Sequence, residues 1–134
     1  MFLHNLPKEL VKPFLDIAYT VASSDGKIAD EEKRTLELYA QELRLEKLPE
    51  GNIVDYSETL DKFASLDTVL KKEVFFELLA MAKADAKITD GENDLLDIAA
   101  DKLAISGEMR AELEDVLTSL ALAYHELTVI LQKK

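Results

Sequence analysis

Residues 22–43 of the sequence align with residues 82–103 without a gap. Several matched residues are polar or lie between helical segments, where a shared helical period alone would not align them. The repeat predicts two related helix–loop–helix hairpins packed with pseudo-twofold symmetry. The identical pairs are Ala22/Ala82, Asp25/Asp85, Lys27/Lys87, Ile28/Ile88, Asp30/Asp90, Glu32/Glu92, Leu36/Leu96, Ala40/Ala100 and Leu43/Leu103.

Apolar spacing and the scarcity of turn residues indicate that the whole chain is helical. Its 134 residues include only four glycines and three prolines, fewer than the many turns of an all-β domain require. The stretch VFFELLAMA at 74–82 is apolar on nearly every side, as expected of a central helix buried by its neighbours. We therefore expect one all-α domain over residues 1–134, a single bundle of six to seven helices with an internal duplication.

Helices are expected at about 8–24, 30–47, 55–66, 69–84, 90–104 and 107–132, with Pro13 kinking or splitting the first of them. The hairpin repeats then span about 10–46 and 70–106, and residues 48–55 form a linker.

The long C-terminal helix, about 107–132, has apolar residues at steps of three and four that form one stripe along its length. Core packing is the usual explanation of such a stripe, and a dimer seam or a groove for a partner helix is the alternative. The stripe consists of Met109, Leu113, Val116, Leu120, Tyr124, Leu127 and Leu131.

Charge and composition exclude several classes of function. A formal net charge of −11 disfavours nucleic acid and anionic membranes, and favours cations or the basic surface of a protein partner. The absence of cysteine excludes disulfides and thiolate metal sites. Neither a signal peptide nor a membrane-spanning segment is recognisable, so we expect a cytoplasmic protein with no direct membrane insertion.

The corner between the first two helices, SSDGKIADEE at 23–32, has the pattern D-G-x-I-x-x-x-E, which matches the second half of a calcium loop. The first half does not fit. The first and third loop positions fall on Val21 and Ser23 in one copy, and on Met81 and Lys83 in the other. Because calcium takes about six or more oxygen ligands, a standard EF-hand is not expected.

Helix capping explains the same letters without any ligand. Gly26 can adopt the left-handed conformation after a helix end. Thr89 and Glu92 form a capping box, in which each satisfies a backbone N–H of the other. Glu32 occupies the matching place in the first copy, although Ala29 there has no capping oxygen.

A cation site is the second interpretation of the corners. If the two corners lie side by side, their carboxylates gather at one end of the bundle and raise one another's pKa at a cost in stability. A bound divalent cation, such as Ca²⁺, Mg²⁺ or Mn²⁺, would relieve that cost. The candidate ligands are Asp25, Asp30, Glu32, Asp85, Asp90 and Glu92.

The paired A-x-x-D-G-x-I-x-x-x-E corners in an acidic helical chain resemble the TerB-like family, named for tellurite resistance. The resemblance covers about 10–105, and the second copy departs from it where Ala86 replaces the glycine and Gly91 enters the capping box. It implies an all-helical fold with an internal repeat, metal chelation by the acidic corner residues given above, and a role in stress response or in metal and tellurite resistance. No catalysis is implied.

The sequence thus favours a non-enzymatic cytoplasmic module that holds a divalent cation and presents a surface to a protein partner, with a homodimer as one candidate. The alternative is a pure protein-interaction scaffold whose corners are only helix caps. A remote alternative is a carboxylate-dependent hydrolase, for which only Asp16, Glu77 and Glu126 lie near apolar stretches. The acidic helix face formed by Asp90, Asp94, Asp97 and Asp101 is interpreted as solvated, and a docking stripe for a basic partner or a weak cation site is the alternative.

Overall fold

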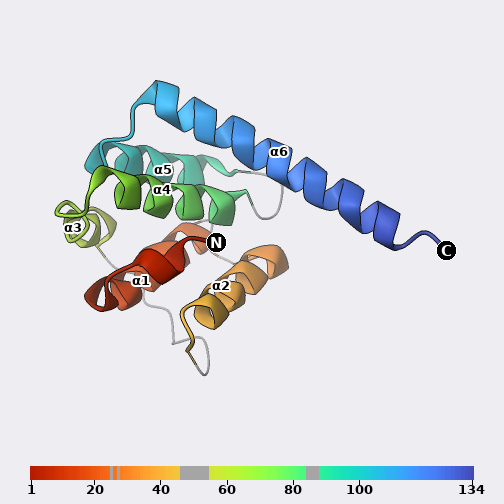
Figure 1. Ribbon diagram of the computed structural model, residues 1–134. Helices are drawn as coiled ribbons and strands as arrows, with labels where there is room; N and C mark the ends of the chain where they lie inside the picture. The colour runs from red at the N-terminus through yellow and green to blue at the C-terminus, as the bar shows by residue number, and fades with distance from the viewer. Residues whose placement is uncertain (25, 27, 46–54, 84–87) are drawn as a thin grey trace.

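Six α-helices, two short 3-10 helices and no strand make up residues 1–24, 26, 28–45, 55–83 and 88–134, which the computed structural model describes (Figure 1). The predicted all-α bundle is confirmed. The elements are η1 (Leu3–Asn5), η2 (Lys8–Leu10), α1 (Val11–Ala22), α2 (Asp30–Glu42), α3 (Tyr56–Asp61), α4 (Thr68–Ala82), α5 (Asp90–Lys102) and α6 (Gly107–Leu131).

The helices lie where the apolar spacing predicts them, but several are shorter than expected. The segment expected at 8–24 is split into η2 and α1, and the split comes before Pro13, which lies in the first turn of α1. A proline there removes no helical hydrogen bond, because the N–H groups of a first turn have no partner within the helix. Most of the expected linker at 48–55 lies outside the described residues.

Helix α4 is the centre of the core, as its apolar sequence predicts. It packs against α1, α2, α5 and α6. Phe75, Leu78, Leu79 and Met81 are fully buried within it. Each such side chain contributes about 1.5–3 kcal/mol on leaving water, so α4 supplies a large part of the energy that holds the bundle together.

The two hairpins have helix limits at corresponding residues. Helix α1 ends at Ala22 and α4 at Ala82, while α2 begins at Asp30 and α5 at Asp90. Just beyond α2 and α5, Arg44 and Ala104 have positive φ angles of 59° and 57°. The sequence repeat therefore coincides with a repeat of local backbone structure.

Helix α6 lies across the bundle with its first half and extends beyond it with its second (Figure 1). None of its residues is buried. Met109, Leu113 and Leu117 are partly buried against the core. Core packing is therefore the wrong explanation for the rest of the predicted stripe, because those side chains are exposed: Val116, Leu120, Tyr124, Leu127 and Leu131.

Candidate functional site

The two acidic corners lie beside each other. A methyl group added at Gly91, in the first turn of α5, would lie 3.5 Å from the backbone oxygen of Ser24 and 3.6 Å from its hydroxyl. Ser24 belongs to the corner between α1 and α2. The start of α5 thus contacts the corner between α1 and α2. The repeat predicts that these two regions lie side by side.

Both corner glutamates cap the helix that follows them. Glu32 and Glu92 are buried, and each accepts a hydrogen bond through Oε1 from a backbone N–H: from Ala29 at 3.1 Å and from Thr89 at 3.0 Å. In the second corner the hydroxyl of Thr89 also accepts from the Glu92 N–H at 3.1 Å. The predicted capping box is confirmed there, while in the first corner Ala29 offers no side-chain acceptor.

The capping box of the second corner leads to a prediction. The Thr89 hydroxyl accepts the N–H of Glu92 at 3.1 Å at the start of α5. We expect Thr89→Ala to lower the free energy of unfolding by about 1 kcal/mol, since this N–H would lose its acceptor. Urea denaturation measures the change, and a stabilising Thr89→Ala would contradict the capping assignment.

The two aspartates among the predicted cation ligands that the structure describes are not buried with the two glutamates. Asp30 and Asp90 are exposed in the first turns of α2 and α5, while Asp25 and Asp85 lie outside the described residues. Within the part of the chain that is described, no three His, Asp or Glu side chains come together as a metal ion requires. Oε2 of Glu92 is nevertheless buried without a hydrogen-bond partner.

The acidic face of α5 is exposed along its length, which agrees with a solvated surface. Arg110 of α6 contacts this face, because its guanidinium donates to Asp97 at 2.6 Å and to Asn93 at 2.9 Å. Lys102 instead pairs with Asp61 of α3 at 2.7 Å. The face therefore serves partly to attach the start of α6 to the bundle.

A groove lies between α6, α4 and the N-terminal residues. It consists of two adjoining hollows of about 300 and 600 Å³, and most of the side chains that line them are apolar. Met1, Phe76 and Leu120 line both hollows, and the larger one is also lined by Leu117, Tyr124 and Leu127.

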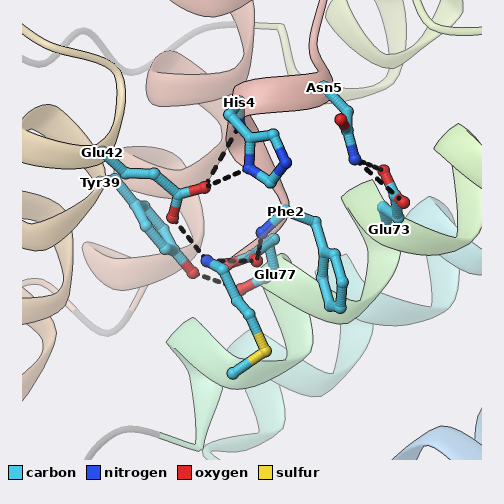
Figure 2. A network of polar contacts seen from close by, with 8 residues as sticks. Phe2, His4, Asn5, Tyr39, Glu42, Glu73 and Glu77 are labelled. Carbon is cyan, nitrogen blue, oxygen red and sulfur yellow. Dashed lines mark hydrogen bonds and ion pairs between the residues drawn. The ribbon is translucent and has the colours of Figure 1, made fainter.

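The N-terminal wall of the groove is fixed by ion pairs (Figure 2). The Met1 ammonium lies 2.5 Å from Glu42 and 2.9 Å from the buried Glu77, whose Oε1 also accepts the N–H of Phe2 at 2.9 Å. Burial alone would lower the pKa of the Met1 amine, but the hydrogen bonds to both carboxylates raise it above its ordinary value. These contacts place the Phe2 ring edge-on to Phe76, with centroids 6.0 Å apart.

The sequence contained a signal for this groove that the stripe alone did not convey. Residues 116–132 carry one charged side chain, Glu126. Such a helix is apolar on most sides and is expected to be covered. Among the described residues, no helix combines the length and apolar character that a membrane crossing requires.

The three carboxylates considered for a hydrolase lie in separate places in the fold. Asp16 pairs with Lys12 on the surface of α1, and Glu77 binds the N-terminal ammonium. Glu126 is exposed on the outer half of α6. Nothing in these contacts places two carboxylates in contrasting environments around one substrate, as acid–base catalysis requires.

Comparisons with protein-family models, with curated proteins and with solved structures find no match to this chain. The TerB-like resemblance therefore stays a prediction that rests on the paired corners.

Proposed function

We propose that this chain is a non-enzymatic protein-binding module, in which a helical bundle presents α6 and the adjoining groove to a helix of another polypeptide. The single observation that carries the proposal is the exposure of the apolar stripe beyond Leu117. Tyr124 is 74 % exposed and Leu131 is 73 % exposed, whereas apolar side chains of α4 such as Phe75 and Leu78 have no solvent exposure.

The energetics of α6 support a covering partner. Soluble monomers seldom expose contiguous apolar patches beyond a few hundred Å² unless the patch binds something. Here the exposed stripe is continuous with an apolar hollow of about 600 Å³ that is lined by the buried Phe76 and the exposed Tyr124. An amphipathic helix laid into such a groove gains affinity through side chains at positions i, i+3, i+4 and i+7.

Photocrosslinking in the native cells tests this proposal. With p-benzoylphenylalanine in place of Leu127, we expect a covalent product with a polypeptide. The same group in place of Glu37, an exposed residue of α2, should give none. Absence of any polypeptide product at Leu127 and also at Leu120 would overturn the proposed function. A product with a different protein and a product with a second copy both support it, and mass spectrometry separates the two.

A divalent cation at the paired corners is a second candidate function, and Glu92 favours it. One buried carboxylate oxygen that lacks a hydrogen bond is costly, and a bound cation is one group that would satisfy it. The contact between Ser24 and Gly91 supports the same view, because it brings a residue of each hairpin's corner region together.

We also propose that the two hairpins arose by duplication and that the chain is a TerB-like module acting in stress or in metal and tellurite resistance in the cytoplasm. Support comes from the gap-free repeat, from the matching helix limits and from the buried capping glutamates at corresponding positions, Glu32 and Glu92.

A further inference from the structure

We infer that the occupant of the α6 groove is a second copy of this chain, and that two α6 helices pack antiparallel about a twofold axis near Leu120. The inference rests on the proposed function, since it names the partner of that same surface.

The exposed apolar area is sufficient for a stable dimer. Seven large apolar side chains on the stripe and the groove walls are exposed. At about 60–120 Å² each, they would remove roughly 400–800 Å² per chain from water. Stable interfaces remove about 600–1,000 Å² per partner, and the partly buried Phe2, Leu113 and Leu117 add to the area available. The seven are Met1, Val69, Val116, Leu120, Tyr124, Leu127 and Leu131.

An antiparallel arrangement makes the stripe complementary to itself. With Leu120 at the axis, Val116 of one chain lies opposite Tyr124 of the other, and Leu113 lies opposite Leu127. A closed twofold interface requires this property, because the same surface must serve both partners. Small residues next to the larger ones, Ala121 and Ala123, leave room for the second helix in the groove.

The charges on α6 favour the same arrangement. Its first turns carry the exposed acids Glu108 and Glu112, and its C-terminal end is followed by Lys133 and Lys134. Antiparallel packing brings the lysines of each chain to the acids of the other, at both ends of the interface. Parallel packing would set the acids against their own copies, which costs free energy.

The net charge of the molecule disfavours self-association through surfaces other than α6, and it also disfavours binding of α6 to an anionic membrane. A chain of net charge −11 repels its own copies over most of its surface, and α6 from 116 to 132, with Glu126 as its one charged residue, is where that repulsion is weakest. The same net charge opposes attachment of α6 to an anionic lipid surface. The charge distribution therefore favours a second copy over a membrane as the occupant of the groove.

Sedimentation velocity of the full chain between about 1 and 100 µM tests the inference. We expect a concentration-dependent dimer whose Kd rises about 100-fold or more in Leu120→Glu, since a carboxylate would be buried at the axis. The matched control is Leu122→Glu, on the opposite side of the same helix, where the wild-type leucine is 58 % exposed. It should change Kd by less than about threefold. Circular dichroism and thermal unfolding establish that both variants fold.

Charge reversal tests the orientation. The double variant Lys133→Glu, Lys134→Glu should dimerise more weakly at low salt, and mixing it with Glu108→Lys, Glu112→Lys should restore association. A monomer at 100 µM would overturn the inference, and crosslinking of Leu127 to another protein would then still support the proposed function. A dimer that is insensitive to Leu120→Glu, or binding to phosphatidylcholine vesicles in place of dimerisation, would also overturn it.

Discussion

Phe75→Ala should lower the free energy of unfolding by about 3–5 kcal/mol, the loss typical of a fully buried aromatic side chain. Phe75 has no solvent exposure and lies in the middle of α4, which packs against α1 and α2 of the first hairpin and against α5. The ring also lies 5.9 Å from the guanidinium of Arg110. Its removal therefore loosens the attachment of α6 as well as the core, because a cation–π contact at a partly buried site is lost.

Urea denaturation of the full chain measures this loss, and Leu38→Ala provides the control. Leu38 is an apolar residue of α2 that is 56 % exposed and does not line the groove, so its truncation should cost less than about 0.5 kcal/mol. If α6 self-associates, both variants must be compared at one protein concentration, because dimerisation adds to apparent stability. A loss below about 1 kcal/mol in Phe75→Ala would contradict the central place assigned to α4.

The helices and the corners were predictable because they depend on local sequence. The repeat, the capping residues and the apolar stretch at 74–82 each act over one or two turns, and the structure confirms the elements that they specify. The adjacency of the corners followed from a longer inference, that similar hairpins pack symmetrically, and the contact of Ser24 with Gly91 agrees with it.

The exposure of α6 was not predictable from its periodicity. An apolar stripe has the same sequence whether it faces its own core or another chain. What decides between the two is the area of bundle that is available to cover it. Helix α6 has 25 residues and is about 37 Å long, whereas α4 has 15 and is about 22 Å long. Because α6 is longer than the helix it packs against, its C-terminal half is left uncovered.

The N-terminal wall of the groove was also not predictable from the sequence. Met1 and Phe2 contact Glu42 and Glu77 because η1 packs against both α2 and α4. No short-range pattern links residues so distant in sequence. The burial of Glu77 within an apolar stretch was visible in the sequence, but its partner, the Met1 ammonium, was not.

A divalent cation should stabilise the chain by about 2.7 kcal/mol at a concentration 100 times its Kd, if the paired corners hold it. The physical reason is the buried Glu92, whose Oε2 lacks a hydrogen bond in the structure described. Calorimetric titration with Ca²⁺, Mg²⁺ and Mn²⁺, together with thermal unfolding, measures the effect. Glu92→Gln should abolish it while the fold is kept, since the amide oxygen can still accept the N–H of Thr89.

The behaviour of Glu92→Gln without any cation distinguishes the two interpretations of the corner. If the negative charge is what makes the unpaired oxygen costly, the neutral amide should leave the metal-free chain as stable as the original or more stable. Asp94→Asn, an exposed carboxylate on the same helix, should keep the full response to the cation. Absence of heat and of any thermal shift with all three ions would leave Glu32 and Glu92 as helix caps alone, which is the scaffold interpretation.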